Sequence, residues 1–163
     1  MREVPAANHP AVERVRAALA AARVEAEIVE LSAAARTARA AADQLGCDVA
    51  QIANSLVFRC EASGAPLLVM TSGANRVDPA RVAALIGEPI GRADADFVRR
   101  ASGFAIGGVA PVGHTAPIRT LIDRSLLGHA ELWAAAGHPH TVFRLTPDEL
   151  VRITGGVLAE VAA

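Results

Sequence analysis

The sequence predicts one mixed α/β (α+β) domain over residues 1–163, with a largely antiparallel sheet or a partly open barrel and peripheral helices. Its 163 residues are the size of one ordinary domain. Hydrophobic residues make up 52% of the chain and charged residues 20%, which favours a well-filled core over disorder. Helical and strand periodicities follow one another without a linker, a composition break or a fixed-period repeat, so a single domain is expected.

The N-terminal part predicts a helix, a strand and a second helix. An amphipathic helix is expected over residues 8–22, with Asn8 as its candidate N-cap. Apolar and acidic residues alternate over residues 24–31, which indicates a half-buried strand. Thr37 can cap the second helix, which ends near Leu45 because Gly46 is available for a left-handed C-terminal position.

Two β-rich runs follow, at residues 55–61 and 66–71. The loop between them contains Ser63 and Gly64, a pattern typical of a hairpin. We expect these two strands at the centre of the sheet.

Two further helices are marked by residues that favour helix ends. Asp78 precedes Pro79 and opens a helix that ends at Gly87. Asp94 opens another, which ends near Gly103.

The C-terminal part predicts short strands and a last helix. Thr146 and Glu149 form a capping box, in which each side chain can bond the other residue's free amide. Before this helix, β-like runs at residues 119–123, 131–135 and 140–145 are joined by short loops and are expected to form a meander.

Composition excludes several classes of protein. Two cysteines, Cys47 and Cys60, are too few for a disulfide framework and lack the spacing of a zinc site. The N-terminus has no apolar signal core and no stretch approaches the length of a membrane span, so we expect a cytoplasmic location and no membrane contact. The net charge of -1 gives no basic stripe, so DNA is not an expected partner and any nucleic acid must be held locally.

Residues 103–114, GFAIGGVAPVGH, concentrate four glycines and a proline. Such a loop lets a ligand approach backbone amides closely, but a tight connection between two elements explains the same composition. The glycine spacing is not that of a dinucleotide-binding fingerprint, and no lysine follows as in a phosphate-binding loop. His114 beside the glycines is a candidate for contacting a bound ligand.

Small polar residues and one arginine follow the second predicted hairpin strand. They can line a polar pocket at the end of the sheet, or they can form a strand-to-helix turn in which Asp78 is only a cap. The candidate pocket residues are Thr71, Ser72, Gly73, Asn75 and Arg76.

His138 and His140 are two residues apart, which on a strand points their side chains to opposite faces and disfavours joint metal ligation. His138 is therefore expected to have a structural or hydrogen-bonding role. The sequence also lacks a G-x-S-x-G elbow and a cysteine with a neighbouring histidine, so no covalent nucleophile is expected. No metal or cofactor is expected.

Taken in chain order, these segments resemble the YbaK/EbsC family, which comprises editing domains of bacterial prolyl-tRNA synthetases and free-standing deacylases. The resemblance covers nearly the whole chain, and its carriers after the helix at residues 37–45 are IANSLVFR, PLLVMTSGANRVD, GGVAPVGH and AAAGHPH. It implies hydrolysis of mischarged tRNA bearing a small amino acid of the alanine, serine, threonine or cysteine type. The implied partners are the acceptor end of aminoacyl-tRNA and an aminoacyl-tRNA synthetase.

The resemblance also implies roles for individual residues. The amides of Gly107, Gly108 and Val109 would hold the ester carbonyl, with His114 as a candidate for orienting water. The candidate substrate-binding residues are Asn54 and Ser55 at the entrance, Thr71, Ser72, Gly73, Asn75 and Arg76 in the pocket or at the adenosine end, Pro111 and Gly113 in the loop, and His138 as a buttress.

Asn54 departs from the family pattern. Members commonly carry a lysine at this position, where it helps to hold the tRNA acceptor end. A non-catalytic module that binds aminoacyl-tRNA, a nucleotide or a synthetase is therefore the alternative function.

Overall fold

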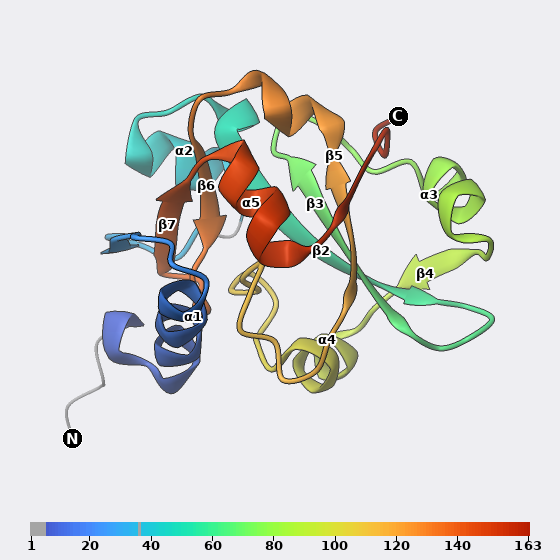
Figure 1. The fold of residues 1–163 in the computed structure, drawn as a ribbon, viewed down its shortest axis with the longest axis horizontal. Helices are drawn as coiled ribbons and strands as arrows, with labels where there is room; N and C mark the ends of the chain where they lie inside the picture. Colours follow the sequence, from blue (N-terminus) through green and yellow to red (C-terminus); the bar gives the residue numbers. More distant parts are fainter. Residues whose placement is uncertain (1–5, 36) are drawn as a thin grey trace.

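The computed structural model describes residues 6–35 and 37–163, which form one open mixed sheet with helices on both faces (Figure 1). The strand order is β1-β7-β6-β2-β3-β5-β8, and β4 pairs with β2 off this path. The strands are β1 (Ile28–Glu30), β2 (Ile52–Cys60), β3 (Pro66–Ser72), β4 (Ile90–Arg92), β5 (Arg119–Asp123), β6 (Leu132–Ala135), β7 (Thr141–Leu145) and β8 (Val157–Ala159). The helices are α1 (Pro10–Ala21), α2 (Ala38–Leu45), α3 (Pro79–Ile86), α4 (Ala95–Ser102) and α5 (Pro147–Thr154).

Helix ends follow the predicted caps, with one exception. Thr37, Asp78, Asp94 and Thr146 each accept a hydrogen bond from an amide of the first helical turn, and the predicted capping box of α5 is present. The N-cap of α1, however, is His9 and not Asn8. Asn8 ends a 3-10 turn, while His9 is extended and its Nδ1 accepts from the Ala11 amide at 3.1 Å.

The predicted hairpin is confirmed as the centre of the sheet. Strands β2 and β3 pair antiparallel, and each has a parallel neighbour, β6 beside β2 and β5 beside β3. Of the pairings between described strands, four are antiparallel and three parallel, so the sheet is more evenly mixed than expected.

The predicted meander of the last strands is wrong for β5. Strands β6 and β7 pair antiparallel as expected, but β5 lies between β3 and β8, parallel to both. Four of its five residues are buried, because a strand inside the sheet is covered on both faces. The segment Arg124–Gly128 carries the chain as a 3-10 turn away from β5 toward β6.

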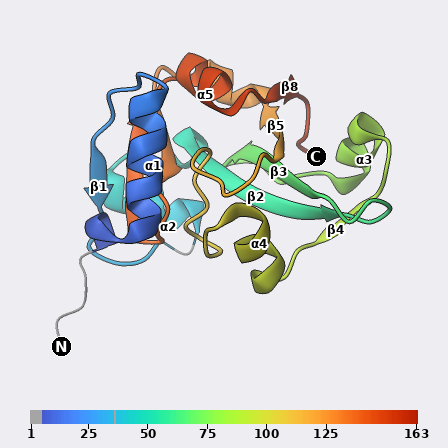
Figure 2. The same ribbon diagram turned by 60° about the horizontal axis from the view of Figure 1, so that its bottom comes forward.

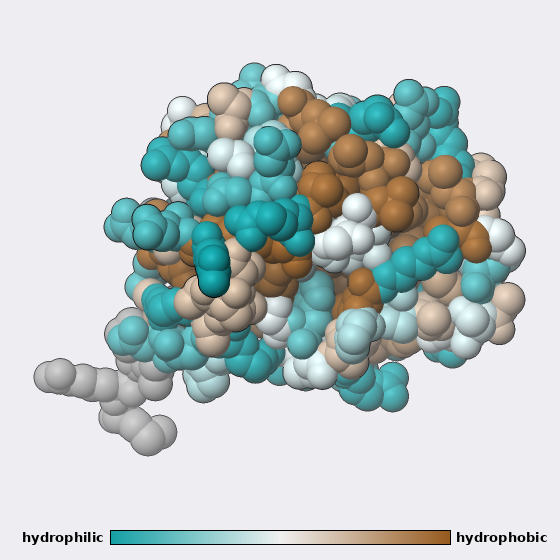
Figure 3. Space-filling model, viewed as in Figure 1, coloured by the Kyte–Doolittle hydropathy of each residue, from teal (hydrophilic) through white to brown (hydrophobic). Residues whose placement is uncertain are grey.

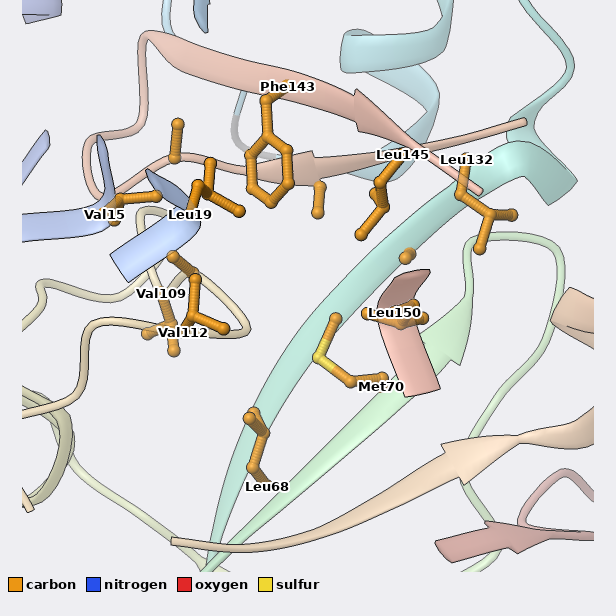
Figure 4. Close-up of a cluster of buried hydrophobic side chains, with 14 of the residues drawn as sticks. Val15, Leu19, Leu68, Met70, Val109, Val112, Leu132, Phe143, Leu145 and Leu150 are labelled. Carbon is orange, nitrogen blue, oxygen red and sulfur yellow. The ribbon is translucent and has the colours of Figure 1, made fainter. Parts of the chain in front are cut away.

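The larger core lies between one face of the sheet, the helices α1 and α5, and the loop that joins α4 to β5. Figure 4 shows Val15 and Leu19 of α1, Val109 and Val112 of the loop, and Leu150 of α5 around the side chains of the strands. The loop lies between α1 and the β2–β3 hairpin (Figure 2). The glycine-rich segment is therefore part of the core boundary.

The opposite face of the sheet is covered by α3 and the C-terminal segment. Leu67 and Val69 of β3 alternate with Leu68 and Met70 of the larger core, and pack with Val82 of α3. A third, smaller cluster joins α2 to the start of β2.

Apolar side chains are also exposed on the face shown in Figure 3, over the edge formed by β5 and β8 and over α3. Leu85, Leu127 and Val157 are among the exposed large hydrophobic residues. Among the helices formed by residues 6–35 and 37–163, none has the length and apolar character needed to cross a membrane.

Candidate functional site

A cavity of about 200 Å³ opens where the first half of β2 meets β6, α2 and the glycine-rich loop. Its walls come from four parts of the chain: residues 35 and 37–41 around the start of α2, residues 52–56 of β2, residues 106–109 of the loop, and residues 133–142 of β6, β7 and their connection. The sheet places the second and fourth parts side by side, because Ile52 and Ala53 pair with Trp133 and Ala134.

The cavity is small, and the described residues that line it are mostly apolar and include no charged residue. Its polar members are Thr37, Asn54, Ser55 and Thr141. Three of their side chains have partners: the Thr37 hydroxyl caps α2, the Ser55 hydroxyl lies 3.3 Å from the Met70 sulfur, and the Thr141 hydroxyl donates to a backbone carbonyl. Within the described ranges, no hydrogen bond engages the Asn54 amide, so this side chain can serve a ligand.

The glycine-rich loop is divided between two sides of the molecule. Gly107 and Val109 line the cavity, whereas Gly108 is buried between them. The Gly108 amide donates to the Ala105 carbonyl at 2.9 Å, which closes a turn. In the part of the chain that the structure describes, the amides of Gly107 and Val109 have no hydrogen-bond acceptor, which makes them candidate donors to a ligand.

Gly108 lies directly against the backbone of His138. A β-carbon at position 108 would be 2.8 Å from His138 Cα and 2.9 Å from its amide nitrogen, closer than real β-carbons come. Here glycine is required for close approach of two backbones, not for a positive φ. The contact fixes the first half of the loop relative to the segment that precedes β7.

The second half of the loop faces α1 and α5, away from the cavity lining. Pro111, Gly113 and His114 line a separate hollow with residues of these helices. The His114 Nε2–H donates to the Ala110 carbonyl at 2.7 Å, and burial lowers the pKa of His114 although this bond opposes the shift. Because its Nε2–H is bonded to the backbone, the His114 side chain stabilises the conformation of the loop.

Ser72 and Asn75 hold a buried carboxylate. The Ser72 amide and the Asn75 side chain donate to Asp123 Oδ2 at 3.1 and 3.0 Å. The amide and hydroxyl of Ser125 donate to Asp123 Oδ1 at 3.0 and 2.7 Å. Burial alone would raise the pKa of Asp123, but these hydrogen bonds together outweigh it and lower the pKa.

The remaining candidates, at the end of β3 and between β3 and α3, lie outside the cavity lining. Thr71 is buried in β3, opposite Asn54 in the strand register. Gly73 packs against the 3-10 turn before β2, where an added β-carbon would be 2.5 Å from the Val49 carbonyl oxygen. Arg76 is exposed, and its carbonyl accepts from the Ala163 amide. The structure therefore gives this segment the geometry of a strand-to-helix turn.

His138 adjoins the cavity through its backbone. Its carbonyl accepts from the Thr141 hydroxyl at 3.0 Å, and its neighbour Pro139 lines the cavity. Sequence reasoning missed Pro139, Thr141, Ile106 and Trp133, which all line the cavity. A signal was available for Trp133, which is the chain's single tryptophan in a sequence poor in aromatic residues.

Within residues 6–35 and 37–163, no group of three or more His, Cys, Asp or Glu side chains is arranged to hold a metal ion. Cys47 is half-buried and Cys60 buried, both are free thiols, and burial is the main cause that raises the pKa of each.

Comparison with known proteins identifies similar sequences and structures. Residues 32–153 match the family described as Aminoacyl-tRNA editing domain. A crystal structure of a proposed trans-editing enzyme for prolyl-tRNA synthetase is 42% identical, with a TM-score of 0.89 over 95% of this chain and 98% of that one. A scaffold protein used for epitope backbone grafting is 41% identical, with a TM-score of 0.89 over 94% and 98% of the two chains.

One further relative has no assigned function. The uncharacterised protein YwhH of Bacillus subtilis is 28% identical over 126 residues, which span 77% of this chain and 80% of that protein. The resemblance to an aminoacyl-tRNA editing family that the sequence suggested is confirmed by the family match and by the solved structures.

Proposed function

Because this chain belongs to the aminoacyl-tRNA editing domain family, we propose that it is a trans-editing hydrolase that deacylates mischarged tRNA carrying a small amino acid. The amino acid is of the alanine, serine, threonine or cysteine type. The acceptor end of aminoacyl-tRNA is the substrate, an aminoacyl-tRNA synthetase is the second partner, and the reaction takes place in the cytoplasm. A separate editing site serves accuracy, since a synthetase pocket separates amino acids that differ by one methylene by only about 10- to 200-fold.

The observation that carries the proposal is a small cavity whose described lining residues are uncharged, beside the amides of Gly107 and Val109, which have no acceptor among the described residues. At about 200 Å³ the cavity is below the usual size of drug-ligand pockets, about 300–1,000 Å³. Alanine and threonine side chains form much of its wall, and a small aminoacyl group matches such a space.

The chemistry requires a water molecule and donors for the developing oxyanion. Water attacks the ester carbonyl carbon, the bond to the ribose oxygen breaks, and that oxygen takes up a proton as the free amino acid leaves. The amides of Gly107 and Val109 support the oxyanion, because the Gly108 amide is already bonded to Ala105. The proposal assigns no water-orienting role to His114, whose Nε2–H is bonded to Ala110.

The site residues of the proposal follow from the cavity lining. Asn54 and Ser55 contact the substrate at the entrance, and Thr141 and Trp133 flank it. His138 holds the loop in place through its backbone. The ribose hydroxyl of the terminal adenosine, or the substrate's own side chain, assists the attack, as in the family that the sequence resembles.

Incubating the protein with alanyl-, seryl-, threonyl- and cysteinyl-tRNA tests the proposal. We expect deacylation above buffer for at least one of them and none for a tRNA charged with a large aromatic amino acid. Trp133 provides a parallel binding assay, because the chain has one tryptophan and no tyrosine and its fluorescence reports the cavity directly.

A non-catalytic binding module is the alternative, favoured by the uncharged Asn54 in the cavity lining. A change in Trp133 fluorescence with aminoacyl-tRNA but no turnover on any substrate would support this alternative and refute the hydrolase. Turnover without a fluorescence change would show that the reaction occurs outside this cavity.

A further inference from the structure

Three histidines meet beside the cavity wall. The ring centroid of His138 lies 5.4 Å from that of His9 and 5.4 Å from that of His140. His9 precedes α1, whereas the other two flank Pro139, which lines the cavity. Residues far apart in the sequence therefore bring imidazole groups together next to the proposed substrate site.

Backbone hydrogen bonds determine which ring nitrogen of His9 and of His138 carries the proton. Nδ1 of His9 accepts from the Ala11 amide, and Nδ1 of His138 accepts from the His140 amide, both at 3.1 Å. An amide can only donate, so each Nδ1 is without a proton and each Nε2 carries one. Both rings thus present an Nε2–H donor even when they are uncharged.

The surroundings of His138 favour the neutral state of this ring. Burial lowers the pKa of His138, and His9 and His140 lower it further, whereas Glu30 opposes the shift. Neutral imidazoles in contact avoid mutual repulsion, but they still attract a group with several acceptor oxygens. An oxyanion gains most, because hydrogen bonds to a charged acceptor are about twice as strong as neutral ones.

We propose that His9 and His138, with His140 beside them, form a binding site for a phosphate group. This inference rests on the proposed function: the phosphate is that of the nucleotide strand that ends in the aminoacylated adenosine. None of the described residues that line the cavity is charged, and the three histidines at its border offer donors for a phosphate. The same chemistry admits free phosphate, and the experiment below distinguishes the two sources.

Nuclear magnetic resonance of the histidine rings tests the proposal in the intact protein at neutral pH. Inorganic phosphate and the trinucleotide CCA are titrated separately, and the five histidines are followed together. We expect saturable shifts for His9, His138 and His140 with both ligands, at lower concentration for the trinucleotide. His129 and His114 are internal controls, because neither belongs to the cluster.

Two outcomes would overturn the proposal. Shifts that do not saturate, or that are equal for all five histidines, would show that phosphate acts only through ionic strength. Saturable binding of inorganic phosphate without binding of the trinucleotide would overturn the assignment to a nucleotide strand.

His9→Asn is the informative variant, since asparagine is a good N-cap and keeps the start of α1 while the Nε2–H donor is lost. We expect binding of the trinucleotide to weaken by about tenfold or more, as is typical for loss of a hydrogen bond to a charged group. His129→Asn is the matched control and should leave binding unchanged. Equal affinities of the two variants would refute the role of His9.

This binding assay does not depend on turnover. Phosphate binding at the three histidines with no deacylation of any tRNA would refute the hydrolase proposal and support the phosphate site. Deacylation without phosphate binding would refute the phosphate site and support the hydrolase proposal.

Discussion

Replacing Gly108 by alanine tests the contact between the glycine-rich loop and the segment before β7. The added β-carbon would lie 2.8, 2.9 and 3.0 Å from the Cα, N and C atoms of His138. All three are backbone atoms, so no side-chain rotation relieves the overlap. Gly108 does not have a positive φ, so the cost comes from overpacking alone, which is typically about 1–3 kcal/mol.

Urea unfolding followed by Trp133 fluorescence measures this cost. We expect the free energy of unfolding of Gly108→Ala to fall by about 1–3 kcal/mol. Its turnover on the preferred aminoacyl-tRNA should fall by about 100-fold, because a shift of about 1 Å in the amides of Gly107 and Val109 spoils the alignment with the ester.

Gly128→Ala is the matched control for the same substitution. No atom lies within 4 Å of a β-carbon at position 128, and its φ is not in the positive range. Its stability should stay unchanged or rise by up to about 1 kcal/mol, since alanine restricts the unfolded chain. If the two variants unfold at the same urea concentration and turn over equally, the backbone contact at His138 does not hold the loop, and the reasoning fails.

Three further substitutions test other parts of the structure. Asn54→Lys should tighten tRNA binding and steepen the slope of log affinity against log salt by about 0.7–0.9, the release of one counterion; an unchanged slope would show that position 54 does not meet a phosphate. Asp123→Asn should lower the free energy of unfolding by about 2 kcal/mol at neutral pH. Because folding lowers the pKa of Asp123, its contribution is complete well above pH of about 3.9 and is lost as the pH falls through the folded-state pKa, so urea midpoints of wild type and variant should converge in acid. A constant gap across that range would contradict the assigned ionisation. Thr146→Ala removes the cap of α5 and should cost about 1 kcal/mol in the same unfolding assay; no loss would mean that the capping box is already frayed in solution.

Helices were predictable because their ends depend on local chemistry. Thr37, Asp94 and Thr146 mark helix starts through side-chain bonds to amides three residues away, and no distant contact is needed to predict them. His9 was missed as a cap because imidazole is an uncommon N-cap and Asn8, a favoured type, stands next to it.

Strand neighbours were harder to predict, since pairing depends on contacts between distant segments. Nothing in the composition of β5 distinguishes a meander strand from one that lies parallel to β3. The strands β4 and β8 have three residues each, too few for a periodic pattern, and each pairs with a longer strand that is distant in the sequence, β2 or β5.

The candidate site was predictable only in part. Gly107, Val109, Asn54 and Ser55 of the expected residues line the cavity, because they lie on the loop and strand that the motifs mark. Ser72 at the end of β3 and Asn75 after it donate to Asp123, a partner about fifty positions away that the sequence alone does not connect with them. Thr141 could not be foreseen as cavity-lining, since its neighbours there come from other strands.

The recognisable editing region and the part of the chain that shapes its loop have different boundaries. Helix α1 precedes the matched residues 32–153, yet Arg14 donates to the Gly103 carbonyl and lies over the Phe104 ring at 4.9 Å. Added β-carbons at Gly113 and Gly137 would lie 3.3 and 2.9 Å from the backbone of α1, so this helix packs on the glycine-rich loop and on the β6–β7 connection, the two segments that meet at Gly108. A fragment trimmed to the matched region would keep the residues that line the cavity but lose α1, which packs on both the glycine-rich loop and the β6–β7 connection. Fusion or truncation of this protein should therefore spare α1, since this helix supports the glycine-rich loop although it lies outside the segment that matches the family.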